Sequence, residues 1–292
     1  MHRWILRSAA VASTIVWLAV ATRVRAQQPS AATSQPAAAT ATQPAASSSG
    51  PAPQASNTTP RPAIEPRVGE VLDRACTLLS EAKAVTYHAE ITFDSVLPSL
   101  VKLQYAAAMD VAIERPNRLA IKFDGDLGAK RLWYDGKTLT LYDLPHKAYG
   151  TIAAPDTIDA MLNEVAAQKN LTIPLAGFDY SNPCKRVRGQ VIDSKYVGLN
   201  DAAGVDCDHL AFIQPEADWQ LWVQHSGKPL PRKIVITYKN LPTQPQWVAV
   251  LSDWRFDQPL GASMFEPKIP KGTLKVDFLE LKKDTQQQLK KD

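Results

Sequence analysis

Residues 101–114 read VKLQYAAAMDVAIE, and apolar side chains occupy every odd-numbered position from Val101 to Ile113. The even-numbered positions hold polar or small side chains. Because successive side chains of a β-strand point to opposite faces, this segment has one face suited to a core and one suited to water. A strand of this length spans roughly 40 Å, well beyond the usual length of about five or six residues, and such strands twist and coil. The segment therefore predicts a long strand in a strongly curved sheet.

Three turn sequences divide the residues that follow. They are Arg115–Arg118, in which Pro116 has a fixed φ, then Asp124–Gly128, and then Asp135-Gly136, a dipeptide favoured in tight hairpins. The segments between the turns continue the alternation of apolar and polar residues. Residues 101–143 are therefore predicted to form four antiparallel strands, a meander on which the rest of the protein packs.

The other predicted elements come in blocks of helices and blocks of strands. Apolar residues at helical spacing predict helices at Val68–Ala82, Asp156–Lys169 and Asn182–Val187, with an irregular or short helical segment at Leu171–Phe178. Alternation predicts strands at Tyr87–Phe93 and Ala148–Ile152, a series from Val191 to Phe256, and a last strand or short helix at Leu274–Leu281. This order predicts an α+β fold, mainly antiparallel β, rather than a βαβ repeat.

The first 66 residues are predicted to lie outside the folded domain. Residues 1–26 combine a basic start, an apolar run too short for a typical membrane span, and small residues up to Ala26. This layout predicts a signal peptide cleaved near Ala26, with an uncleaved signal anchor as the alternative. Residues 27–66 are rich in Ala, Pro, Ser, Thr and Gln and predict a disordered linker. One domain is expected at 67–272, followed by a C-terminal strand and charged tail at 273–292.

The basic charge of the chain belongs to the predicted signal peptide. The formal net charge is +4, and residues 1–26 hold four arginines and no acidic residue, so the remainder is close to neutral. Nucleic-acid binding needs a basic patch, and we therefore exclude a nucleic acid as partner. No cysteine stands directly after the apolar run, which disfavours a lipid-anchored lipoprotein. We expect a periplasmic protein that is peripheral to a membrane at most.

The chain has three cysteines, which allow at most one intramolecular disulfide in an oxidising compartment. A bond between Cys184 and Cys207 is the favoured prediction, and it leaves Cys76 free. It would close a loop of roughly two dozen residues and stabilise the fold by ~3 kcal/mol in the chain-entropy description. The alternative is that all three are small, buried apolar side chains.

Several of these segments resemble known families. Arg115–Leu119, Tyr134–Leu139 and Tyr142-Asp143 resemble the lipoprotein-localisation carriers LolA and LolB. Gly204–Phe212, Asp218–Trp222 and Leu230–Lys239 resemble the predicted periplasmic family called domain of unknown function 2092, and this likeness covers about Val68 to Pro270. The resemblance implies a LolA-like fold, an open and strongly curved antiparallel half-barrel with helices covering its concave face. It implies the function of a lipoprotein carrier only by analogy of fold.

No motif for catalysis or metal binding has the required spacing. Gly136-Lys137-Thr138 lacks the glycine that a phosphate loop needs where Arg131 stands, and a strand rather than a helix follows it. Cys207 and His209 share one face of a predicted strand, but that face is mostly apolar and no second pair of ligands accompanies them. The sequence has no nucleophile elbow, no Cys-x-x-Cys and no His-Glu-x-x-His. We therefore expect no enzyme activity, no metal and no cofactor.

The remaining functional feature is the apolar face of the meander under the helix predicted at Asp156–Lys169. The residues predicted to line a ligand cavity there are Leu103, Tyr105, Met109, Val111, Ile121 and Phe123 from the strands, with Met161 and Leu162 from the helix. In one interpretation this cavity binds an acyl chain, a lipid or the anchor of a lipoprotein under a helical lid. In the other, the face is only a closed core, and the chain is an envelope protein-interaction, sensor or regulatory module without a ligand.

Overall fold

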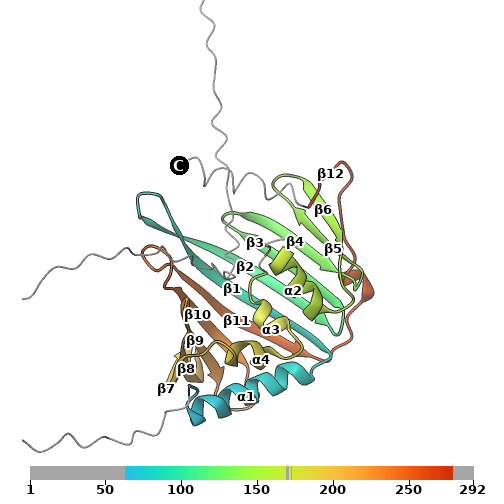
Figure 1. Ribbon diagram of the computed structural model, residues 1–292. Helices are drawn as coiled ribbons and strands as arrows, with labels where there is room; N and C mark the ends of the chain where they lie inside the picture. Colours follow the sequence, from blue (N-terminus) through green and yellow to red (C-terminus); the bar gives the residue numbers. More distant parts are fainter. Residues whose placement is uncertain (1–62, 169–170, 172, 279–292) are drawn as a thin grey trace, which may run out of the picture. The chain divides into compact units, whose positions relative to one another are not determined.

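The computed structural model of the chain describes residues 63–168, 171 and 173–278. The predicted signal peptide, nearly all of the predicted linker and most of the C-terminal tail lie outside these residues. The described residues form a sheet of twelve strands in the order β12-β6-β5-β4-β3-β2-β1-β11-β10-β9-β8-β7 (Figure 1). Strands β12 and β7 are its two edges, so the sheet is not closed. Neighbouring strands are antiparallel except β12, which runs parallel to β6.

The predicted meander is confirmed as four of these strands. They are β2 (Lys102–Glu114), β3 (Arg118–Gly125), β4 (Gly128–Tyr134) and β5 (Thr138–Asp143). The other strands are β1 (Ala84–Val96), β6 (Ala148–Ala153), β7 (Asp193–Ala202), β8 (Val205–Ile213), β9 (Ala217–Gln224), β10 (Pro231–Tyr238), β11 (Gln246–Phe256) and the short β12 (Leu274–Lys275). Strand β11 returns to pair with β1, and this pairing joins the two halves of the sheet.

The turn between β4 and β5 shows how local chemistry sets the register of the meander. The Asp135 carboxylate accepts hydrogen bonds from the backbone N–H groups of Lys137 at 2.9 Å and Thr138 at 2.7 Å. Gly136 has a φ of +87°, and a Cβ at this position would lie 2.6 Å from the side-chain nitrogen of Asn117. Only glycine therefore fits this turn without a rearrangement.

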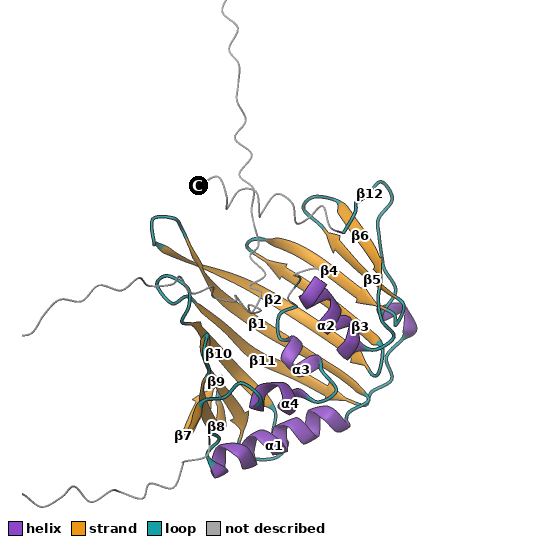
Figure 2. Ribbon diagram, viewed as in Figure 1, coloured by secondary structure: helices purple, strands orange, loops and turns teal. Residues whose placement is uncertain are grey.

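In the described part of the chain, four α-helices lie on the same face of the sheet, α1 (Pro66–Glu81), α2 (Ile158–Gln168), α3 (Ala176–Asp179) and α4 (Pro183–Arg188) (Figure 2). A 3₁₀-helix, η1, follows at Ala262–Met264. The buried stripe of α1 is the one that its helical spacing predicts, namely Val68, Val71, Leu72, Ala75 and Leu79. It packs against apolar side chains of β8 and β9 in one cluster. A larger cluster unites α2 with strands β1 to β5 and β11. The helices therefore cover two adjoining apolar regions of one sheet.

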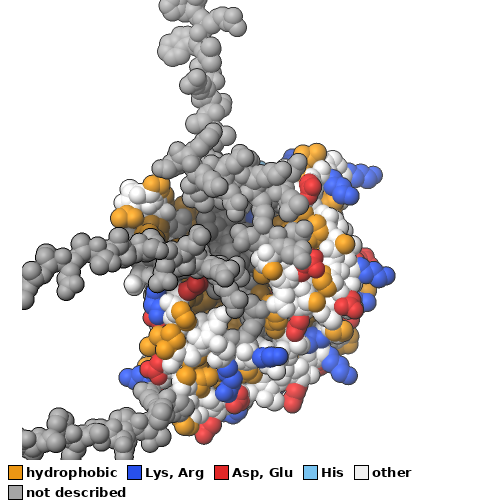
Figure 3. All heavy atoms as spheres, in the orientation of Figure 1, with side chains coloured by type: hydrophobic (Ala, Val, Ile, Leu, Met, Phe, Trp, Pro, Cys, Tyr) orange, Lys and Arg blue, Asp and Glu red, His pale blue; other side chains and the backbone are white. Residues whose placement is uncertain are grey.

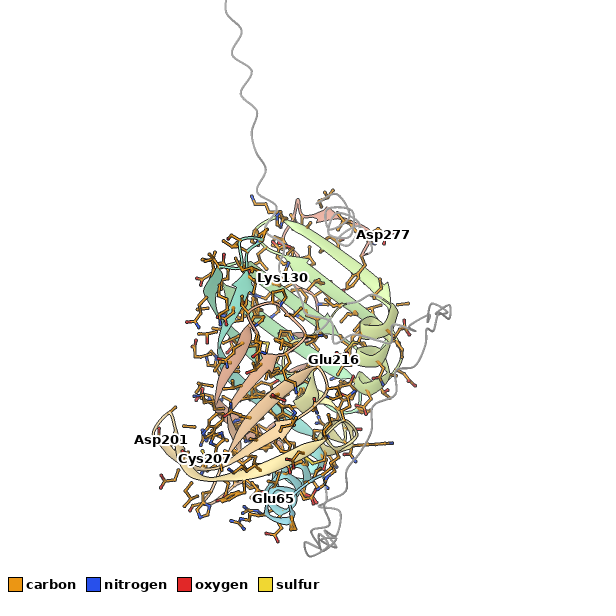
Figure 4. All side chains as sticks on the ribbon, turned by 60° about the vertical axis from the view of Figure 1, so that its left-hand side comes forward. Glu65, Lys130, Asp201, Cys207, Glu216 and Asp277 are labelled. Atoms are coloured by element: carbon orange, nitrogen blue, oxygen red, sulfur yellow. A yellow bond between two sulfur atoms is a disulfide. The ribbon has the colours of Figure 1, made fainter. Side chains whose placement is uncertain are left out.

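The disulfide prediction is wrong. Cys184 is bonded to Cys76, with 5.7 Å between their Cα atoms, and Cys207 is a free, buried thiol. Cys207 lies beside the end of the β7–β8 hairpin, near Asp201 (Figure 4). Its neighbour Asp208 contacts arginines of α1, so strand alternation turns Cys207 to the opposite face of the sheet from the helices. Cys184 and Cys76 lie on adjacent helices, α4 and α1, and can meet.

Candidate functional site

The apolar face under α2 brings together six of the eight residues predicted to line a cavity. Those six belong to one buried cluster, namely Met109, Val111, Ile121, Phe123, Met161 and Leu162. The pairing of β2 with β3 places Met109 opposite Phe123 and Val111 opposite Ile121, so the sheet side of the cluster follows directly from the meander. Helix α2 supplies the other side through Met161 and Leu162.

Leu103 and Tyr105 do not join this cluster. Leu103 is 38% exposed. Tyr105 is half-buried and contacts the ring of Phe93, with 5.9 Å between the ring centroids. Both residues precede Ala107, where the pairing of β2 with β3 ends, so within the described part of the chain β3 does not extend the apolar face to them.

A small cavity of about 10 Å³ remains beside the cluster. Its walls are Ile121, Phe123, Lys130, Leu132 and Leu141 from β3, β4 and β5, with Leu171, Ile173 and Pro174 from the segment after α2. This volume is about that needed for one water molecule. The cavity is therefore too small for an acyl chain in this conformation.

One ion pair borders the cavity. The Lys130 ammonium donates to the Asp143 carboxylate at 2.6 Å, and both side chains are largely buried. Burial alone would raise the pKa of Asp143, but Lys130 and His146 outweigh burial and hold that pKa below its usual value. Asp143 is therefore the charged partner that keeps Lys130 at the cavity wall.

The N-terminal part of α2 is fixed by hydrogen bonds. The Ile158 backbone N–H donates to the Pro116 carbonyl at 2.9 Å, and the Tyr134 hydroxyl donates to the carbonyl of Pro155, just before the helix. The Asp159 carboxylate accepts from the Ser181 hydroxyl at 2.6 Å. These contacts tie one end of the helix to the β2–β3 turn and to the segment after α3.

A buried polar group that the sequence analysis did not identify lies beside these helices. Asp179, at the end of α3, is 1% exposed and accepts a hydrogen bond from the Tyr87 hydroxyl at 3.1 Å. Burial raises the pKa of Asp179 to about 7, although Tyr87 and Arg115 oppose this. The Arg115 guanidinium donates to the carbonyls of Leu79 at 3.3 Å and Tyr180 at 3.1 Å.

This group connects separate elements of the fold. Arg115 lies in the β2–β3 turn, and its two carbonyl partners belong to α1 and to the residue after α3. The Asp179 Oδ2 atom and two guanidinium nitrogens of Arg115 are buried without a hydrogen-bond partner among residues 63–168, 171 and 173–278. Because unpaired buried polar atoms are costly, these three atoms lower the stability that the packing of Arg115 and Asp179 provides.

A second buried carboxylate holds α1 onto the sheet. The Asp208 side chain is fully buried on β8 and accepts from the Tyr196 hydroxyl at 2.7 Å. Arg67 and Arg74 of α1 approach the same carboxylate at 3.5 and 3.3 Å, and His225 lies 3.1 Å from it. Burial would raise the pKa of Asp208, but Tyr196, His225 and Arg67 outweigh it and lower the pKa. This arrangement is an anchor for a helix rather than a reaction centre.

The two residues considered as metal ligands lie on the other face. The His209 ring stacks on Trp222, with 3.9 Å between their centroids, and its Nε2 lies 2.9 Å from the Gln220 side-chain oxygen. Within the part of the chain that the structure describes, no three His, Cys, Asp or Glu side chains gather as a metal site would require. Nor does any helix of that part have the length and apolar character needed to cross a membrane.

Residues 69–279 match the family described as a predicted periplasmic protein, domain of unknown function 2092. The chain belongs to this family. The resemblance found in the sequence is thereby confirmed, and the family is described as predicted to be periplasmic. No curated protein matches the chain.

Solved structures similar to this chain come from several bacteria. LprF from Mycobacterium bovis is 14% identical with a TM-score of 0.42, and the match covers 72% of this chain and 98% of that chain. The lipoprotein LppX from Mycobacterium tuberculosis is 10% identical with a TM-score of 0.40, with coverages of 68% and 99%. A LolA superfamily protein from Nitrosomonas europaea is 12% identical with a TM-score of 0.32, with coverages of 68% and 97%.

Proposed function

We propose that this chain is an exported, non-enzymatic protein that binds an apolar ligand between its sheet and a helical lid. The ligand class is an acyl chain, a lipid or the anchor of a lipoprotein. In this proposal the sheet is a strongly curved half-barrel, and the helices α2 and α3 cover its concave face. The observation that carries the proposal is the apolar cluster formed by α2 and six strands, β1 to β5 and β11, with a small cavity beside it.

The chemistry of the cluster favours a ligand without polar groups. Its sheet side presents Met109, Val111, Ile121 and Phe123, and Met161 faces them from α2. Methionine is unbranched and adaptable, so a wall that contains two methionines can repack around a flexible chain. Lys130 and Asp143 stand at the border of the cavity, where they can face the polar end of such a ligand.

The size of the lid contact sets the length of the ligand. Helix α2 buries four apolar anchors in the cluster, Ile158, Met161, Leu162 and Val165. Exposing all four would cost roughly 6–12 kcal/mol, at about 1.5–3 kcal/mol each. A buried methylene contributes ~0.8 kcal/mol, so a ligand must bury roughly 8–15 methylenes to offset the opening of the lid. We therefore propose that long acyl chains bind and short ones do not.

We propose the periplasm as the location of the protein, and the proposed ligand class is consistent with this location. We propose that residues 1–26 direct export and are removed near Ala26, that residues 27–66 are a linker, and that residues 67–272 form the binding domain. Intact-mass measurement of protein from the cell envelope should give a chain that begins near Gln27. An unprocessed N-terminus in all envelope protein would favour a signal anchor instead.

Native mass spectrometry of freshly purified protein tests the ligand proposal directly. We expect a bound apolar molecule, and we expect the emptied protein to bind a fluorescent hexadecanoyl probe but not the matching octanoyl probe. Met109→Glu should abolish binding of the hexadecanoyl probe, because a charge in the cluster lacks a partner. Circular dichroism of this variant must show a retained fold. Wild-type protein that carries no lipid and binds neither probe would refute the proposal.

One observation favours a second function. The cavity is too small for an acyl chain in this structure, and the edge strand β7 exposes Val197 and Leu199 by 45% and 58%. An exposed sheet edge can pair with an extended segment of another protein. The chain would then be an envelope protein-interaction, sensor or regulatory module with a closed core. Cross-linking from position 199 in the envelope, together with absence of lipid from the purified protein, would support this alternative.

A further inference from the structure

The hairpin between β1 and β2 ends in an exposed apolar segment, Leu97–Leu103, which we call the β1–β2 tip. Its sequence LPSLVKL contains no acidic residue and one basic residue, Lys102. Leu97, Leu100, Val101 and Leu103 are 39%, 58%, 51% and 38% exposed. They are four of the ten large apolar side chains that are exposed among the described residues. Such a concentration in seven consecutive residues marks an interaction surface.

The tip projects beyond the neighbouring strands. Pairing of β1 with β11 ends at Phe93, and pairing of β2 with β3 ends at Ala107. The pairing of β1 with β2 continues to Val96 and Lys102, so among the described residues no strand pairs with the last part of the hairpin on either side. Figure 1 shows this hairpin extending past its neighbours, and apolar side chains appear at the same place in Figure 3.

The tip is an ordered turn with a backbone that does not suit its sequence. The Leu97 N–H donates to the Val101 carbonyl at 2.9 Å, and the Leu100 N–H donates to the Leu97 carbonyl at 2.8 Å. Leu100 has a φ of +63°, in the left-handed region that favours glycine or asparagine. A leucine that is exposed at such a position stabilises neither the turn nor a core. Its side chain is therefore available for a contact outside the chain.

We propose that the β1–β2 tip inserts into the interface of a lipid bilayer. A stable protein–protein contact buries about 800 Å² on each partner, which a seven-residue projecting finger does not offer by itself. A bilayer needs no complementary groove, and the tip presents its apolar side chains at its far end with no carboxylate among them. Penetration by such side chains is favourable in proportion to the apolar area buried.

Aromatic residues stand directly behind the tip. The rings of Phe93 and Tyr105 lie 5.9 Å apart, and Phe93 pairs with Trp247 across β1 and β11. Aromatic side chains favour the headgroup level of a membrane, where an apolar body and a polar end are both accommodated. Lys102, 3.4 Å from Asp94, lies between the apolar end and this band, where an ammonium can reach lipid phosphates. The hairpin therefore carries apolar side chains at its end, with a lysine and aromatic rings behind them.

Co-sedimentation with vesicles of phosphatidylethanolamine and phosphatidylglycerol tests this proposal. The test variant is Leu100→Asn, because asparagine accepts the left-handed backbone. The matched control is Leu199→Asn on β7, since Leu199 and Leu100 are both 58% exposed. Intact mass should show the same N-terminus in all proteins. We expect wild type and control to sediment with the vesicles, and Leu100→Asn to partition at least about tenfold more weakly.

A second variant and a second measurement make the result decisive. Val101→Ser should weaken vesicle binding in the same direction, and circular dichroism should show the wild-type fold for every variant. Lack of co-sedimentation of the wild type, or equal loss in Leu100→Asn and Leu199→Asn, would overturn the proposal. So would wild-type self-association without lipid that Leu100→Asn abolishes, because the tip would then bind a second copy. None of these outcomes depends on a ligand under α2.

Discussion

Replacing Asp179 with asparagine should stabilise the protein at neutral and alkaline pH and leave it unchanged in acid. Burial raises the pKa of this carboxyl group from 3.8 to about 7. Between these values the folded state holds a proton that the unfolded state has released, so stability falls as pH rises from about 4 to about 7. A pKa difference of about 3 corresponds to about 4 kcal/mol. Asparagine has nearly the same shape and cannot ionise, so this loss should disappear.

Urea unfolding of wild type and Asp179→Asn at about pH 4 and about pH 8 measures this effect. We expect the variant to be more stable by up to about 4 kcal/mol at the higher pH and similar at the lower. The exposed position Glu81 offers a control, since Glu81→Gln removes one charge at the end of α1 without touching Tyr87 or Arg115. An effect of Asp179→Asn on the free energy of unfolding that is equal at both pH values would refute the reasoning. It would show that the pKa of Asp179 is the same in the folded and unfolded states.

Three further predictions follow from the packing. Met161→Ala, at a fully buried position of α2, should lower the free energy of unfolding by about 2–5 kcal/mol while keeping the fold by circular dichroism, and should speed probe uptake. Non-reducing peptide mapping should recover Cys76 joined to Cys184, and reduction of this bond, which links residues 108 apart, should cost about 4–5 kcal/mol. Asp208→Ala should lower the free energy of unfolding, measured in urea, by only about 1–3 kcal/mol, because its arginine partners are about half exposed and can be hydrated. A loss smaller than about 0.3 kcal/mol would contradict this.

The sequence predicts the meander because its strands are consecutive and its turns are chemically specific. Alternation over residues 101–113 defines the inner face, and the Asp135-Gly136 turn fixes where the next strand begins. The pairing of β1 with β11 has no such local signal, since their residues lie more than 150 positions apart. Alternation shows which face of a strand is buried but not which strand lies beside it. The sequence alone therefore does not show that β1 pairs with β11 and joins the two halves of the sheet.

In the candidate site, too, the sequence predicts contacts between consecutive strands but not contacts between distant segments. Met109 and Phe123 are neighbours because adjacent strands of a meander must pair, whereas Leu103 carries the same pattern and lies outside the cluster because β3 ends before it. The disulfide failed for a related reason. Cys184 and Cys207 are close in sequence, which favoured that pair in the prediction. The alternation of side chains along β8, however, places the Cys207 thiol on the face of the sheet opposite to the helix that carries Cys184. The sequence does not indicate that Asp179 is buried, because its burial depends on how α3 packs against the rest of the fold.

The cavity and the β1–β2 tip lie toward the same end of the sheet. Ala107 of β2 pairs with Gly125, so the β3–β4 turn is at the tip end of β2, and Phe123 and Lys130 line the cavity two residues from Gly125 and Gly128. A tip that docks on a bilayer would bring this end of the cavity toward the lipid. Leu100→Asn should then slow transfer of the hexadecanoyl probe from vesicles to the protein by about tenfold, because fewer molecules are docked. Its affinity for the probe in free solution should stay unchanged, since Leu100 is remote from the buried cluster. Equal transfer rates for Leu100→Asn and wild type would show that the ligand enters without membrane docking at this end.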